Sequence, residues 1–74
     1  MSNASEKAFV DAAESCGHET EEYGRGSGRI GPAVRVDSDR DLMGFFADMA
    51  EDGLFDIRNL RFDGCGRGYL VYPL

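Results

Sequence analysis

Two cysteines and one histidine are the side chains of this sequence best suited to nucleophilic catalysis or soft-metal binding. Cys16 and His18 lie close in sequence, and a pair of His18 with Cys65 could form an activated thiol, with Asp63 or Glu19 orienting the ring. A closed structural zinc site needs four ligands, and the chain has no C-x-x-C pair. We therefore expect no catalytic residue, metal or cofactor, although a small Cys/His-based metal or thiol protein remains an alternative.

A glycine-rich segment could bind phosphate. Residues 26–31 match G-x-G-x-x-G, the pattern of dinucleotide-binding loops. That loop works only when a helix N-terminus follows it, whereas here Pro32 and a valine-rich stretch follow. We interpret residues 24–31 as a hairpin loop that is mobile unless a partner holds it, with Arg25 and Arg29 available for contacts to that partner.

Three tyrosines could stack on nucleic-acid bases: Tyr23, Tyr69 and Tyr72. Stacking platforms of this kind lie in cationic grooves, whereas the chain has a net charge of −6. The sequence therefore favours core packing or a protein interface for these rings, since tyrosine is enriched at interfaces.

Charge separates along the chain. Acidic residues concentrate in segments 1–23 and 37–57, and basic residues in segments 24–36 and 58–74. The acidic excess argues against direct nucleic-acid binding, which needs a cationic surface. Acids in the last turn of a helix oppose the helix dipole, so helix stability does not account for those near residue 50. The candidate partner-binding acids are Glu19, Glu21, Glu22, Asp48, Glu51 and Asp52.

Length and composition predict one domain over residues 1–74. A chain of this size buries only about 60% of its unfolded surface and supports one core. No apolar stretch approaches the roughly 20 residues of a membrane span, and the N-terminus lacks a signal-peptide pattern. We expect a soluble cytoplasmic protein with no membrane contact, whose cysteines are free thiols.

Helical spacing predicts the first helix over residues 4–16. Asn3 and Glu6 read as a capping box, and Gly17 ends the helix. The apolar stripe consists of Phe9, Ala12, Ala13 and Cys16.

The second helix is predicted to begin after Ser38, which with Asp41 forms another capping box. Gly53 is its predicted C′ residue, the position just past the helix end. Gly44 is expected to lie where a backbone or ring approaches closely. The apolar stripe here is Leu42, Phe45, Phe46 and Met49.

The remaining segments predict strands. Residues 18–23 and 33–36 could form an antiparallel pair, and residues 55–62 read as a strand with a bulge near Asn59. A loop over 63–68 then leads to a returning strand over 69–72. The result is an α+β fold with two helices on one face of an antiparallel sheet of three to four strands, in the order α-β-β-α-β-β. If the segment before the glycines is irregular, the order becomes α-β-α-β-β.

In size, negative charge and plain α/β composition, and in the acidic blocks 19–22 and 48–52, the chain resembles the small inhibitors encoded by phages and mobile elements, such as anti-CRISPR proteins. The resemblance implies an inhibitor that binds a larger, basic protein or ribonucleoprotein complex in the host cytoplasm. The alternative of a different class is a homodimeric accessory domain, in which a second copy buries exposed Phe or Tyr because the single core is marginal.

Overall fold

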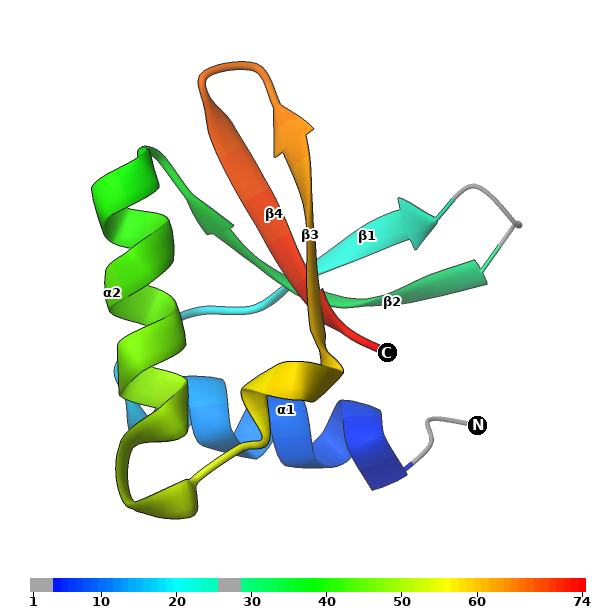
Figure 1. Cartoon of the computed structure of the whole chain (residues 1–74). Coiled ribbons are helices and arrows are strands. Elements are labelled where there is room, and N and C mark those ends of the chain that lie inside the picture. The colour runs from blue at the N-terminus through cyan, green and yellow to red at the C-terminus, as the bar shows by residue number, and fades with distance from the viewer. Residues whose placement is uncertain (1–3, 26–28) are drawn as a thin grey trace.

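A computed structural model of the chain describes residues 4–25 and 29–74 (Figure 1). Its elements are α1 (Ala4–Ser15), β1 (Glu21–Arg25), β2 (Arg29–Val36), α2 (Asp39–Ala50), the 3₁₀ turns η1 (Glu51–Gly53) and η2 (Ile57–Asn59), β3 (Leu60–Cys65) and β4 (Gly68–Pro73). The predicted α+β class and the order α-β-β-α-β-β are confirmed. None of the helices in the described part is long and apolar enough to cross a membrane.

Helix α1 forms and ends much as its sequence predicts. Phe9, Ala12 and Ala13 are buried on one side. Gly17 adopts a left-handed φ of 82°. Its N–H donates to the Glu14 carbonyl at 3.0 Å, and the His18 N–H donates to the Ala13 carbonyl at 2.9 Å. This hydrogen-bond pair satisfies the last helical carbonyls and turns the chain toward β1. Asn3, the predicted cap at the other end, lies outside the described residues.

Helix α2 begins as predicted, with the Ser38 hydroxyl accepting a hydrogen bond from the Asp41 N–H at 3.1 Å. The predicted C′ position at Gly53 is wrong. The helix ends at Ala50, and the left-handed conformation already begins at Asp52, with φ 57°. Residues Glu51–Gly53 instead form η1, a tight turn that redirects the chain before β3.

The role predicted for Gly44 is also wrong. A Cβ at Gly44 would meet no atom within 4 Å, so this glycine is simply an exposed helix position. The close approach occurs at Gly68, the first residue of β4. A Cβ there would lie 2.1 Å from the Val36 carbonyl oxygen.

The four strands form an antiparallel sheet in the order β1-β2-β4-β3. Strand β2 pairs with β1 through residues 29–33 and with β4 through residues 34–36. Figure 1 shows the β1–β2 hairpin diverging from the β3–β4 hairpin, with β2 connecting the two because it pairs with both β1 and β4. The loop predicted over 24–31 is too long, because Gly24 pairs with Ile30 and Arg25 with Arg29.

The strand predicted over 55–62 is correct only in its last part. Asp56 accepts a hydrogen bond from the Arg58 N–H at 3.0 Å, and Asn59 donates to the Asp56 carbonyl at 2.9 Å. These bonds close η2, so β3 begins at Leu60. The shift in apolar phase near Asn59 therefore marks the start of the strand and not a bulge.

The loop between β3 and β4 is shorter than the predicted 63–68. Cys65 pairs with Gly68, which leaves a two-residue turn. Gly66 has φ 63°, while Arg67 has no positive φ. A positive φ at the first turn position alone is the pattern of a type II′ hairpin turn.

The main core lies between the helices and one face of the sheet. Phe9 is fully buried, and its ring makes edge contacts with Phe45 at 6.2 Å and with Phe55 at 6.0 Å between centroids. Strand residues complete the cluster beneath them: Val34, Val36, Leu60 and Val71. These contacts join α1, α2 and the segment between η1 and η2 into one unit.

The opposite face of the sheet holds a smaller apolar layer. Ala33 and Leu70 are buried, yet they lie outside the main cluster. Tyr23 and Tyr72 contact each other at 5.5 Å, and the Tyr23 hydroxyl donates to Asp63 at 2.7 Å. Because β1 and β3 are the two outer strands, the hydrogen bond between Tyr23 and Asp63 requires the sheet to curl. These two tyrosines therefore pack within the fold.

We expect Gly44→Ala and Gly68→Ala to change stability in opposite directions. Alanine at exposed Gly44 removes the helix penalty of glycine and should stabilise the protein by about 1 kcal/mol. Alanine at Gly68 forces β2 and β4 apart and should destabilise it by about 1–3 kcal/mol. Urea unfolding followed by circular dichroism measures both effects. A neutral Gly68→Ala would contradict the close approach of β4 to Val36.

Candidate functional site

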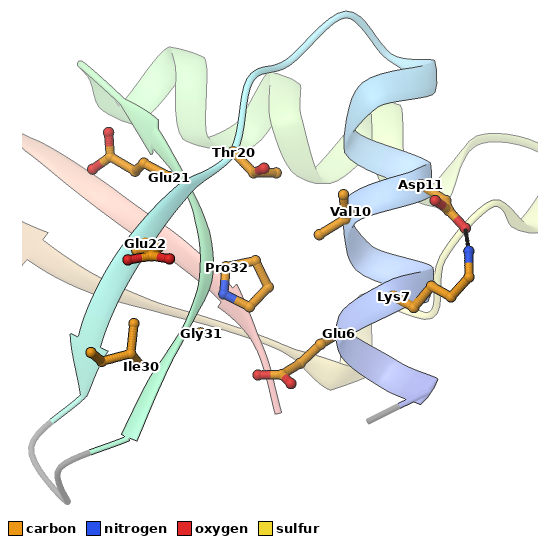
Figure 2. A pocket seen from close by; sticks show the side chains of 10 residues that line it. All are labelled: Glu6, Lys7, Val10, Asp11, Thr20, Glu21, Glu22, Ile30, Gly31 and Pro32. Carbon is orange, nitrogen blue, oxygen red and sulfur yellow. Dashed lines mark hydrogen bonds and ion pairs between the residues drawn. The ribbon is translucent and has the colours of Figure 1, made fainter. Parts of the chain in front are cut away.

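A hollow of about 560 Å³ lies between the first half of α1 and the β1–β2 hairpin. Figure 2 shows it open between the helix and the two strands, with Val10 and Pro32 facing each other across it. We call it the acidic groove. Its lining is Glu6, Lys7, Val10 and Asp11 from α1, Thr20, Glu21 and Glu22 from β1 and the residue before it, and Ile30, Gly31 and Pro32 from β2.

The acidic groove contains four carboxylates and one ammonium group. The Lys7 ammonium is paired with Asp11 at 2.9 Å, and this hydrogen bond raises the pKa of Lys7. Glu21 pairs at 2.9 Å with Arg35, which is not part of the lining. Glu6 is only 8% exposed, whereas Glu22 lies exposed on the hairpin. The groove therefore carries a net negative charge over an apolar floor.

This combination suits the side chains of lysine and arginine. Such residues bury an aliphatic stem against apolar surface while the charged head seeks a carboxylate. Val10 and Pro32 supply apolar surface, and Ile30 is exposed at the hairpin. Glu6 belongs to the α1 wall of the groove and Glu22 to its β1 wall, and Figure 2 shows Glu6 extending from α1 into the space between the helix and the strands.

The sequence predicted Glu21 and Glu22 as contact residues but not Glu6 or Asp11. The sequence predicts a helix-capping role for Glu6. A signal was nevertheless present, because Glu6, Phe9 and Ala13 share one helical face, and a charge on a buried stripe is unusual. The strands that lie opposite Glu6 are set by the direction of the β1–β2 hairpin. The spacing of residues along the sequence does not give that direction.

A second acidic cluster lies at the other end of α1. Asp48, Glu51 and Asp52 surround a hollow of about 380 Å³ together with Ser15, Cys16 and Leu54. We call this the acidic corner. The structure brings these three predicted acids together because α2 and η1 meet the end of α1 there.

Two contacts anchor the acidic corner. Asp48 Oδ2 lies 3.4 Å from His18 Nε2, and the Cys16 thiol donates to the Asp48 carbonyl at 3.6 Å. The His18 ring also packs edge-on against Phe45 at 4.8 Å. Burial raises the pKa of Cys16, and the charges of Asp48 and Glu51 raise it further. This environment disfavours the thiolate, so it opposes use of Cys16 as a nucleophile.

The other predicted residues do not join either cluster fully. Glu19 is exposed and lines a separate hollow with His18, Glu21 and Arg35. Arg25 and Arg29 face each other across the end of the β1–β2 hairpin, and their side chains lie outside the described part. The eight predicted contact residues therefore divide among the acidic groove, the acidic corner, the surface between them and the hairpin end.

The described residues provide no support for the metal site, the Cys65 thiol site or the dinucleotide-binding loop considered from the sequence. Within residues 4–25 and 29–74, no group of three or more histidine, cysteine, aspartate or glutamate side chains is placed to hold a metal ion. Cys65 ends β3, and its side chain is outside the described part. The segment after Gly31 continues as strand to Val36, so the glycine pattern does not open a helix.

Comparison with known proteins gave no relative. No family model matches the chain, and searches of curated proteins and of solved structures found no significant match. The geometry of the two acidic clusters is therefore the basis for a functional proposal.

The thiol of Cys16 reports on the acidic corner. In a Cys65→Ser background, we expect iodoacetamide to alkylate Cys16 faster at neutral pH after Asp48→Asn and Glu51→Gln are combined. Removing the two charges lowers the raised thiol pKa and so increases the thiolate fraction. The difference should vanish at a pH where the thiol is fully ionised in both proteins.

The matched control for that measurement is Glu21→Gln combined with Glu22→Gln, which removes the same charge from the acidic groove. This control should leave the alkylation rate nearly unchanged. An equal acceleration in both double variants would mean that net charge, and not the corner, governs the thiol.

Proposed function

We propose that this protein is a non-enzymatic binding domain that inhibits or modulates a basic, nucleic-acid-handling protein or complex through charge complementarity. The acidic groove is the principal contact and receives lysine or arginine side chains of that partner. The observation that supports this most strongly is the lining of the groove, which includes four carboxylates and a single ammonium, that of Lys7, which is already paired with Asp11.

The chemistry of the groove favours a protein partner over nucleic acid. Phosphate groups would be repelled by the groove and by a chain with a net charge of −6. A cationic protein surface would be attracted instead, and complementary charge speeds association and limits the choice of partner. Apolar contacts to Val10 and Pro32 would add affinity that salt does not screen.

The position of the acidic corner supports an extended contact. It lies at the opposite end of α1 from the groove, so a partner with a long cationic surface could meet both clusters. Surfaces that bind nucleic acid are of this kind, because they neutralise successive phosphates along the backbone. An inhibitor of the anti-CRISPR type would then compete with nucleic acid for the same surface.

Capture of the partner tests this function. The tagged protein is incubated with host lysate in parallel at physiological and at 1 M salt, and bound proteins are identified by mass spectrometry. We expect a basic nucleic-acid-binding protein that is retained at physiological salt and lost at 1 M, where the screening length falls from about 8 Å to about 3 Å. Nucleic acid added in excess should displace it.

Matched charge variants then locate the contact on the captured partner. Glu21→Gln with Glu22→Gln should weaken its binding about tenfold or more, whereas Glu51→Gln with Asp52→Asn should weaken it less. Both pairs remove the same charge from exposed positions, and asparagine tolerates the left-handed backbone at residue 52. Equal losses would show an effect of net charge alone, and unchanged binding in the first pair would remove the groove from the proposal.

A further inference from the structure

Strand β3 is an open edge of the sheet, since it is last in the order β1-β2-β4-β3 of the described strands. The hydrogen bond from the Leu74 N–H to the Asn59 carbonyl, at 2.8 Å, fixes which residues of β3 bond to β4. By the alternation of an antiparallel ladder, Arg61 and Asp63 face β4, and Phe62 and Gly64 point their N–H and C=O groups away from it. Such an edge is a template for another strand.

An apolar hollow of about 300 Å³ borders this edge. Leu42, Met43, Phe46 and Phe62 line it. Phe62 is 49% exposed and Met43 72% exposed, although Phe62 also makes an edge contact with Phe46 at 6.1 Å. The open strand therefore presents an aromatic ring together with backbone groups that point away from β4.

We propose that β3 pairs in antiparallel fashion with β3 of a second copy of this chain, about a two-fold axis that passes between the two Phe62 residues. In this register Phe62 lies opposite Phe62, and the two residues exchange N–H to C=O bonds. Arg61 lies opposite Asp63 of the second copy, and Asp63 opposite its Arg61. The four-stranded sheets join into one continuous sheet.

The sequence Leu60–Cys65 is self-complementary on both faces in this register. Side chains alternate between faces, so the Phe62 pair lies on the helix side over the apolar hollow. The arginine–aspartate pairs lie on the other face, at positions without ladder bonds, where side chains are closest. A two-fold interface requires this kind of self-complementarity, because each copy contributes the same surface.

The present contacts of these side chains are compatible with the pairing. The Arg61 guanidinium donates to the carbonyls of Arg58, at 3.1 Å, and Leu60, at 2.9 Å. On pairing, the Leu60 carbonyl accepts from the Gly64 N–H of the second copy, and Arg61 turns to the opposite aspartate. Asp63 accepts the Tyr23 hydroxyl through Oδ2, which leaves Oδ1 for the arginine.

A charge swap tests the register. Sedimentation equilibrium of the full chain, from micromolar to millimolar concentration, should show a monomer–dimer equilibrium. Arg61→Asp alone and Asp63→Arg alone each place like charges opposite each other twice, and each should raise the dissociation constant about tenfold or more. The double variant, Arg61→Asp with Asp63→Arg, should restore dimerisation.

The swap separates the interface from effects within one chain. Arg61 binds backbone carbonyls and Asp63 binds Tyr23, so exchanging them restores no intrachain contact. Phe62→Thr should also weaken the dimer, whereas Leu54→Ser, at an exposed apolar residue away from β3, should not. Circular dichroism checks the fold of each variant.

A monomer at every concentration would overturn the proposal that β3 pairs with a second copy of this chain. A dimer that the single variants leave unchanged, or that the double variant fails to restore, would overturn the β3 register. Neither outcome bears on the capture experiment, since the acidic groove is built from α1, β1 and β2 and contains no residue of β3.

Discussion

The packing of Phe9 against Phe45 and Phe55 is the contact on which the rest of the molecule depends. It is the place where α1, α2 and the segment before β3 meet, and each contributes one ring. Losing a buried phenylalanine costs about 3–5 kcal/mol, which is comparable with the 5–15 kcal/mol that stabilise a typical domain. In so small a core, these rings and the packing of α1 on β2 and β4 together set the position of α1. Because α1 forms a wall of both the acidic groove and the acidic corner, the aromatic contacts also determine where the negative charge is displayed.

The helices could be predicted from sequence because their signals are local. The stripe through Phe9, the cap at Ser38 and the stop at Gly17 each act within a few residues, and the structure has all three. The strands were predicted less well because their extent depends on a partner. Glycines at 24 and 31 suggested a loop, yet cross-strand pairing carries both hairpin strands through this region. Gly44 and Gly68 show the same limit, since only the position of β2 reveals which of them must lack a side chain.

In the candidate site too, the part that depends on local signals could be predicted and the part that depends on tertiary structure could not. Asp48, Glu51 and Asp52 were recognised because acids oppose the dipole at the end of a helix, which is a local argument, and they do form one cluster. The acidic groove could be predicted only in part, because its second wall comes from a hairpin whose direction is a tertiary property. Glu6 illustrates the difficulty. Its position near a helix start has a sufficient local explanation, so nothing in its spacing required a second role.

Concentrating carboxylates in this way also works against the compact state through mutual repulsion, which the Lys7 and Arg35 ion pairs offset in part.

The division of β2 between two partners has a consequence for how the chain folds. Each hairpin closes over a short stretch, from Arg25 to Arg29 in one case and from Cys65 to Gly68 in the other. The bridge between them, from Val34 to Val71, spans all of α2 and β3. Closing that long segment has the larger entropic cost, and pairings of high sequence separation slow folding. We therefore expect the local contacts of the hairpins and helices to form before the β2–β4 pairing, and we expect this pairing to limit the folding rate.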